Sequence, residues 1–313
     1  MTSFFAALFS ALTIFFFILI GYTLRKGKFI SDGFLNVVPK LLLTVLVPAL
    51  VCHILYSYGT PQNLIAGWHW LVIGLLIPVI SYFLCRFALS RAKDNKEALD
   101  TSAKAYLFAF MFPNFGFMAY PVLMAVYGEA ILLNWTLFTI PYYIMSNVWG
   151  IFILRPKTES KIDWKLAFNP IVGGIIVGMI LALCGLRPPE FIDDVIYMLG
   201  ECVTPLSMML AGFVLGGERL REMFLNPHIY LLSLFRLLIL PLIVFVPLYF
   251  LGYRGLDLAL PVVVTAMPVA VNGVMLAKTY GGDDLTCARN VFLSTIFSML
   301  TLPLVIALLG LIP

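Results

Sequence analysis

Charged residues are scarce in this chain. Only 12% of its 313 residues are Asp, Glu, Lys or Arg, against roughly 25% in soluble domains. The longer polar stretches are residues 90–104 and 155–165, and no Ser/Gly-rich linker separates parts of the chain. This composition excludes a soluble globular domain, and the absence of basic clusters interleaved with aromatics argues against a nucleic-acid surface.

Signatures of metal, redox or catalytic chemistry are missing as well. The sequence has no HExxH motif, and Asp283 and Asp284 lie together at the end of an apolar run without a second aspartate to face them. The chain is therefore not expected to be an enzyme or to hold a cofactor or a metal ion. Five cysteines without CxxC spacing are expected to be small buried hydrophobes: Cys52, Cys85, Cys184, Cys202 and Cys287.

Hydrophobic residues, in contrast, make up 62% of the chain. A spanning helix needs about 20 apolar residues, so the length accommodates about ten spans with short loops. We therefore predict an all-α membrane protein with ten transmembrane helices. The expected spans are residues 4–24, 34–58, 67–89, 105–127, 130–154, 166–186, 191–215, 228–251, 256–280 and 289–312.

Positive charge alternates between the two ends of these spans. Of the 20 Lys and Arg residues, only Arg187 and Arg254 fall in even-numbered connections, and Arg236 falls within a span. The others cluster at the odd-numbered connections, which the positive-inside rule assigns to the cytoplasm. Both termini are therefore predicted to be extracytoplasmic. The first span is preceded by no basic region, so an uncleaved helix is expected rather than a signal peptide.

Two of the apolar spans contain helix-breaking residues. The run from Pro113 to Pro121 places two prolines, an Asn and a Gly in the fourth span, and the run from Ala266 to Gly273 places a Pro, an Asn and a Gly in the ninth. Proline removes a backbone donor and glycine allows departure from helical geometry, so both helices are expected to unwind. Unwound backbone at membrane depth survives only where protein or a water-filled cavity satisfies it.

The two interrupted spans suggest an internal repeat. Both close on a Tyr-Gly pair, and Pro48 of the second span corresponds to Pro205 of the seventh. Residues 1–154 and 155–313 would then each hold five spans. Because five is an odd number, the two sets enter the membrane in opposite orientations and the repeat is inverted. Interrupted spans in corresponding halves are typical of secondary transporters.

Asn114 and Asn272 are the amide residues of the two interruptions, and the helical rise puts both near the middle of the membrane. If the breaks face each other, the half-helices that follow them direct their positive N-terminal ends at one point, which favours an anion. The amides could also donate to a carboxylate. The alternative is that proline and glycine only kink these helices for packing.

Ionisable residues within the spans are few, and each is a functional candidate. Glu201 and Arg236 lie at similar depth and are expected to pair, either as a structural ion pair or with Glu201 as a proton-linked carboxylate. His53 is a further candidate for coupling, or a hydrogen-bonded structural residue. Asn147 and Ser294 rank below the break residues, because most polar side chains in membrane helices bond to their own helix or a neighbour.

The run from Asn114 to Pro121 resembles the Asn-x-Gly-aromatic-x-small-x-Pro signature in the fourth span of the auxin efflux carrier family, which includes plant auxin carriers and bacterial malonate-type permeases. The later run from Ala266 to Pro303 is similar to the pattern of the family's ninth and tenth spans. The resemblance covers the whole chain at the level of span count. The short fifth connection, residues 155–165, departs from many plant members and suggests a compact, prokaryote-like form.

The resemblance implies two inverted five-helix repeats. Spans one, two, six and seven would form a scaffold, and spans three to five and eight to ten a moving transport domain. Spans four and nine would cross at mid-membrane, where an organic anion binds. A homodimer through the scaffold is implied by the resemblance alone. The binding residues carried over to this chain are Asn114, Gly116, Phe117, Pro121, Pro268, Asn272 and Gly273.

The expected function is secondary transport of a small carboxylate, malonate-like or auxin-like, across the plasma membrane by an elevator-like or rocking movement. The two breaks contain no carboxylate, so a dedicated sodium cage is less expected than coupling to protons or to the membrane potential. The fold also resembles that of bile acid:sodium symporters, so sodium coupling stays open. A ligand sensor built on the same fold is the alternative from another class.

Overall fold

The computed structural model describes residues 2–91, 96–155, 169–217 and 227–312. Its described regular structure is helical apart from one isolated β-bridge. The helices of the first half are α1 (Thr2–Lys26), α2 (Phe34–Leu41), η1 (Leu42–Leu46), α3 (Val47–Tyr58), α4 (Pro61–Ala66), α5 (Trp68–Arg91), α6 (Lys96–Met111), α7 (Ala119–Tyr127), η2 (Glu129–Ile131), α8 (Leu132–Met145), η3 (Ser146–Gly150) and α9 (Ile151–Leu154).

The second half continues with helices of similar length. They are α10 (Pro170–Cys184), α11 (Glu190–Glu201), α12 (Val203–Gly216), α14 (Pro227–Leu234), η5 (Phe235–Ile239), α15 (Leu240–Phe250), α16 (Gly255–Thr265), α17 (Asn272–Tyr280) and α18 (Asp284–Leu309).

Six helical segments among the described residues are long and apolar enough to cross a membrane. They agree with six of the predicted spans, and the agreement confirms an all-α, multi-pass membrane protein. Two further apolar helices, α10 and α16, are shorter. In the predicted fourth and ninth spans, the helix stops and restarts, so α6 is followed by α7 and α16 by α17.

Helices from opposite halves of the chain pack closely against each other. α1 lies along α12, and α3 lies along α10. At the first contact, a Cβ added to Gly21 would lie 1.9 Å from a backbone oxygen of α12, and one added to Gly212 would lie 1.8 Å from a backbone oxygen of α1. Glycine is therefore required there, as is common where membrane helices approach closely. Together with α2 and α11, these four helices form one group.

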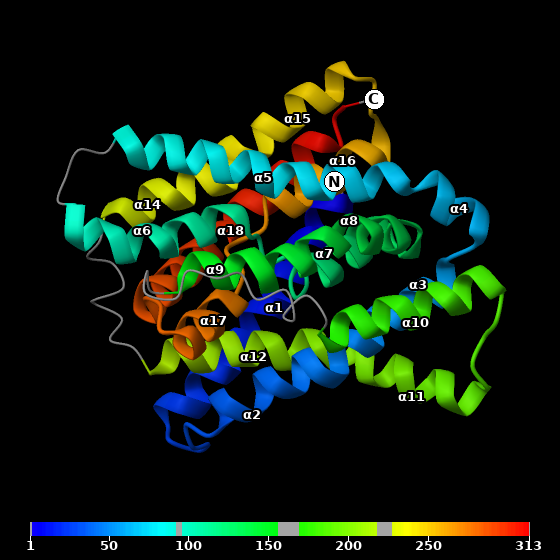
Figure 1. Ribbon diagram of the computed structural model, residues 1–313, viewed down its shortest axis with the longest axis horizontal. Coiled ribbons are helices and arrows are strands. Elements are labelled where there is room, and N and C mark those ends of the chain that lie inside the picture. The colour runs from blue at the N-terminus through cyan, green and yellow to red at the C-terminus, as the bar shows by residue number, and fades with distance from the viewer. Residues whose placement is uncertain (1, 92–95, 156–168, 218–226, 313) are drawn as a thin grey trace.

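The remaining helices form a second group. In it α5 packs on α8 and α6, α15 packs on α16, and α18 packs on α17, α14 and α6. Figure 1 shows α5, α14 and α15 on one side of the molecule and α2, α3, α10, α11 and α12 on the other. α1 also contacts α7 and α18, and α3 contacts α8, so these contacts join the two groups.

The outer faces of the helices carry exposed apolar side chains. Leu75 and Phe83 of α5, Ile180 of α10 and Leu242 of α15 are all exposed, as expected for surfaces that face lipid. Three of the five cysteines are buried, as predicted. Cys184 and Cys202 are exposed, contrary to that prediction, because one ends α10 and the other lies between α11 and α12.

Three helices of the described structure contain a π-helical turn, namely η1, η3 and η5. Pro48 follows η1 and Pro241 follows η5, each within two residues. Proline has no N–H to bond the carbonyl of the preceding turn, which explains the local shift of the hydrogen-bond ladder. Arg236 lies within η5 and is fully buried.

Candidate functional site

The two interrupted helices meet. Residues 112–118 connect α6 to α7, residues 266–271 connect α16 to α17, and the segments form an antiparallel bridge at Pro113 and Val269. The Asn114 N–H donates to the Pro268 carbonyl at 2.7 Å, and the Ala270 N–H donates to the Phe112 carbonyl at 3.1 Å. Backbone N–H and carbonyl groups that have no partner within their own interrupted helix are thus satisfied by the backbone of the other break.

Each break is also tied to a helix that follows it in the chain. Trp135 of α8 donates its indole N–H to the Phe115 carbonyl at 3.0 Å. Ser294 of α18 accepts the Val269 N–H on its hydroxyl oxygen, also at 3.0 Å. The pattern along the chain places Ser294 below the break residues and does not single out Trp135, so neither support was predicted. An indole or hydroxyl inside an apolar span carries no signal of which distant backbone group it meets.

The half-helices after the breaks begin inside this region. α7 starts at Ala119 and α17 at Asn272, and neither first turn has a side chain capping its N–H groups. The Asn114 carbonyl accepts hydrogen bonds from the N–H groups of Met118 and Ala119, at 3.3 and 3.2 Å. Neither N-terminus is capped by a side chain, so the dipoles of both half-helices add positive potential at the crossing without any ionised side chain.

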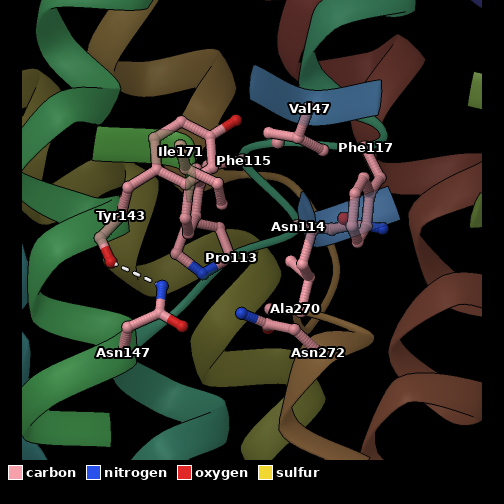
Figure 2. Close-up of a pocket in the computed structure, with 12 residues that line it drawn as sticks. Val47, Pro113, Asn114, Phe115, Phe117, Tyr143, Asn147, Ile171, Ala270 and Asn272 are labelled. Atoms are coloured by element: carbon pink, nitrogen blue, oxygen red, sulfur yellow. Dashed lines mark hydrogen bonds between the residues drawn. The ribbon is translucent and has the colours of Figure 1, made fainter. Parts of the chain in front are cut away.

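A small pocket of about 20 Å³ lies at the crossing (Figure 2), and all of its lining residues are uncharged. Its polar groups include the carboxamides of Asn114, Asn147 and Asn272 and the hydroxyl of Tyr143. Asn114 is only 4% exposed. Within the described residues, the Asn272 carboxamide oxygen and the Tyr143 hydroxyl are buried without hydrogen-bond partners. These unpaired groups are suited to bind a polar solute.

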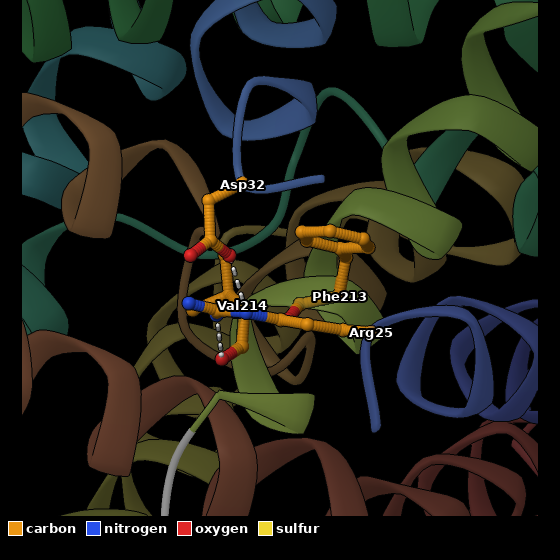
Figure 3. A network of polar contacts seen from close by, with 4 residues as sticks. All are labelled: Arg25, Asp32, Phe213 and Val214. Carbon is orange, nitrogen blue, oxygen red and sulfur yellow. Dashed lines mark hydrogen bonds and ion pairs between the residues drawn. The ribbon is translucent and has the colours of Figure 1, made fainter. Parts of the chain in front are cut away.

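Two larger cavities flank the region. One, of about 750 Å³, includes Arg25, Lys40 and Lys278 in its lining and shares Leu43 and Asn147 with the small pocket. Arg25 is held in place, because its guanidinium donates to the carbonyls of Phe213 and Val214 and pairs with Asp32 at 3.1 Å (Figure 3). Lys40 and Lys278 are exposed. Asp284 also lines this cavity, so three cations face one carboxylate and the net positive charge favours anions.

The other cavity, of about 380 Å³, is acidic, and its lining includes Glu129, Glu201, His53 and Tyr120. Tyr120 of α7 donates its hydroxyl to Glu201 at the end of α11, at 3.1 Å. This hydrogen bond joins the second group of helices to the first. We call this space the acidic cavity.

The predicted pair between Glu201 and Arg236 is not formed. Glu201 is exposed and faces the acidic cavity, whereas Arg236 is buried within the second group of helices. Similar depth along the membrane did not bring them together, because the two side chains leave their helices toward different neighbours. His53 instead lies 3.6 Å from Asp193, which also accepts a hydrogen bond from Tyr56.

The carried-over site residues do not all lie at the pocket. Gly116 and Phe117 line the small pocket with the two break amides, and Pro268 contributes its carbonyl to the crossing. Pro121 lies in the first turn of α7 and lines the acidic cavity instead. Gly273 provides packing space, since a Cβ there would lie 2.5 Å from the Phe108 ring.

Comparison with known proteins gives a consistent match. The profile of a family described as "Membrane transport protein" matches the chain twice, at residues 6–163 and 157–306. An "Uncharacterized transporter" of Methanothermobacter thermautotrophicus is 25% identical over 94% of this chain and 96% of its own length. "Uncharacterized transporter MJ1031" of Methanocaldococcus jannaschii is 26% identical over 74% and 77%, and "Uncharacterized transporter YfdV" of Escherichia coli K12 is 20% identical over 91% and 92%.

Proposed function

Because the chain belongs to the membrane transport protein family, that of the auxin efflux carriers, we propose that it is a secondary transporter for a small organic anion. The solute would be a malonate-like or auxin-like carboxylate that crosses the plasma membrane by alternating access. The observation that carries the proposal is the meeting of two interrupted helices around an uncharged amide pocket. Broken helices that meet in this way are the usual binding site of secondary transporters.

The proposed architecture has ten spans in two inverted repeats, residues 1–154 and 155–313, with both termini extracytoplasmic. Six continuous spans, α1, α10 and the two interrupted helices support the span count, because together they make ten. The double family match supports a repeat. The group built on α1, α3, α10 and α12 would be the scaffold, and the group with both crossing helices the transport domain.

The carboxylate would bind between the amides of Asn114 and Asn272 and the uncapped N-termini of α7 and α17. A space of about 20 Å³ holds roughly one water molecule. Binding therefore requires the lining side chains to separate, and a movement of the transport domain along the scaffold would do this. Leu43, Val47 and Ile171 come from the scaffold side of the pocket, so that movement would change its walls.

Energy coupling has three candidates. The lining residues of the small pocket include no carboxylate, which disfavours a sodium cage there. The acidic cavity contains Glu201 and, beside it, the His53–Asp193 pair, which favours protons. The membrane potential is the third. Sodium symport and a ligand sensor are the competing functions.

Transport should be tested by counterflow of radiolabelled malonate in proteoliposomes, in sodium and in choline medium. We expect accumulation in both media, and loss of accumulation in Asn114→Ala. Asn134→Ala is the matched control, because Asn134 lies on α8 but not in the pocket lining. Binding without accumulation would favour a sensor, and accumulation only in sodium would favour a symporter.

A further inference from the structure

Arg236 is a buried cation for which the mechanism above has no role. It is 0% exposed and lies in the π-helical turn η5. None of its guanidinium nitrogens has a hydrogen-bond partner among the described residues. The hydroxyl of Ser233, one turn earlier on the same helix, is likewise buried and unpaired. Arginine stays charged in proteins, so this position holds a permanent positive charge.

An unpaired buried charge is costly, and proteins rarely retain one without a use. Arg236 packs inside the helix group that contains both crossing helices, not at the lipid-facing surface. In that group η5, which continues directly from α14 into α15, packs against α18. The predicted partner Glu201 faces the acidic cavity and does not neutralise Arg236. The charge of Arg236 can therefore interact with a transiently bound anion.

The charge is connected to the pocket through buried aromatic rings. Tyr142 of α8 lies near enough to Arg236 to interact with it electrostatically. The Tyr142 ring packs against Phe115 with 5.1 Å between centroids, and Phe115 lines the pocket. Tyr142 and Phe115 are 0% and 3% exposed. Because no bulk water separates them, the field of Arg236 reaches the pocket with little screening.

The pocket itself has no charge with which to balance an anion. Its described lining supplies amides, a hydroxyl and apolar side chains. An anion held there within the membrane would carry an uncompensated charge, which hydrocarbon opposes strongly. A fixed cation in the same moving group would reduce that cost, as a co-transported cation does in other carriers.

We propose that Arg236 is the built-in counter-charge for the bound carboxylate, acting through space from behind Tyr142 and Phe115. The proposal rests on the proposed function. It makes Arg236 responsible for discrimination between a carboxylate and its neutral amide. The residue does not contact the solute, so its effect should follow the charge of the ligand and not its shape.

The test compares acids with amides of nearly the same shape. Malonate and malonamide, and indole-3-acetate and indole-3-acetamide, are titrated into purified wild-type protein, Arg236→Gln, Arg236→Met and Arg236→Lys. Unit charges roughly 10 Å apart at an effective dielectric constant of about 20 change a binding constant by about tenfold. We expect both uncharged variants to bind indole-3-acetate, which carries one charge, about tenfold more weakly, and to lose more affinity for malonate, which carries two charges at neutral pH. The amides should bind as they do to wild type, and Lys should restore acid binding.

Arg254→Gln is the matched control, because it removes one positive charge from a guanidinium that is exposed and stacked on Tyr249. Arg236→Met controls for a folding defect. It removes the charge but fills the buried position with an apolar side chain of similar length, which protein interiors tolerate. Equal weakening of acid and amide would assign Arg236 a structural role and overturn the proposal. Unchanged acid binding in both uncharged variants would overturn it while leaving the transporter intact. Wild-type protein that binds neither acid would overturn both.

Discussion

The two interrupted helices use the same residue types in different ways. In the first, Asn114 directly follows Pro113 and lies within the break, where it is 4% exposed. In the second, Asn272 comes four residues after Pro268, starts α17 and is only partly buried. The backbone N–H of Asn114 also bonds across the crossing to the Pro268 carbonyl, while its carbonyl accepts from the start of α7. The first break is thus centred on its amide residue, whereas the second ends with it.

The side-chain hydrogen bonds that hold the two breaks run in opposite directions. Trp135 donates a hydrogen bond to a carbonyl of the first break, whereas Ser294 accepts one from an N–H of the second. The two breaks are therefore not structural copies of each other. Each break satisfies its own unpaired backbone groups with whatever side chain the following helix presents.

The largest difference is expected between the two amides. Asn114→Leu should weaken carboxylate binding about 100-fold and Asn272→Leu about tenfold, because a hydrogen bond to a charged group contributes about 1.5–3 kcal/mol, at the upper end where water is excluded. Titration of purified protein with malonate measures both. Equal losses of malonate affinity would mean that the two amides contribute equally to binding. A larger loss for Asn272→Leu would mean that Asn272 contributes more.

The glycines of the two breaks should differ in stability. Gly273→Ala places a Cβ 2.5 Å from the fully buried Phe108 ring, whereas Gly116→Ala places one 3.0 Å from the Tyr143 hydroxyl at the end of a side chain. Overpacking should cost about 2 kcal/mol at Gly273 and less than about 1 kcal/mol at Gly116. Thermal unfolding in detergent tests this. A more damaging Gly116→Ala would show that the first break is the tighter one.

The hydroxyl that supports the second break should matter more than its neighbour. Ser294→Ala leaves the buried Val269 N–H without its partner and should destabilise the protein by about 1–2 kcal/mol. Ser298→Ala is the control, because its hydroxyl bonds only to the Thr295 carbonyl of the same helix, and it should change stability by less than about 0.5 kcal/mol. Indistinguishable melting temperatures would remove Ser294 as a support.

The smallest effect is expected where α7, the helix after the first break, is tied to the opposite helix group. Glu201→Gln and Tyr120→Phe each remove or weaken one partly exposed hydrogen bond, so binding should change less than about threefold. Malonate uptake measured over a pH series tests the coupling role. If Glu201→Gln leaves the pH dependence of uptake unaltered, Glu201 does not couple protons to transport.

The membrane spans and the positions of the two helix breaks could be predicted from short sequence patterns. Apolar length predicted the spans, and the six continuous spans of the structure agree with it. The prolines and glycines predicted where two helices stop, although Pro121 lies inside α7 and not in the break. Proline in the first turn of a helix loses no hydrogen bond, so composition alone overextended the first break toward its second proline.

The residues that line the pocket or support the breaks could not be predicted in this way. Asn147, Tyr143 and Trp135 come from helices next to the breaks, and nothing in their spacing distinguishes them from packing residues. The expected pairing of Glu201 with Arg236 was wrong for the same reason. Depth in the membrane follows from counting residues, but the direction of a side chain depends on which helices pack around it.

The sequence by itself determined that this chain spans a membrane, which family it belongs to and where two of its helices break. These properties depend on apolar length, on a short motif and on the missing N–H of proline, all of which act within about 20 residues. Only the tertiary structure decided that Pro113 and Val269 meet, that the amides of three separate segments share one pocket and that Arg236 has no hydrogen-bond partner among the described residues. The contact between Pro113 and Val269 joins segments about 150 residues apart. These features depend on how helices pack in three dimensions, which no local pattern encodes.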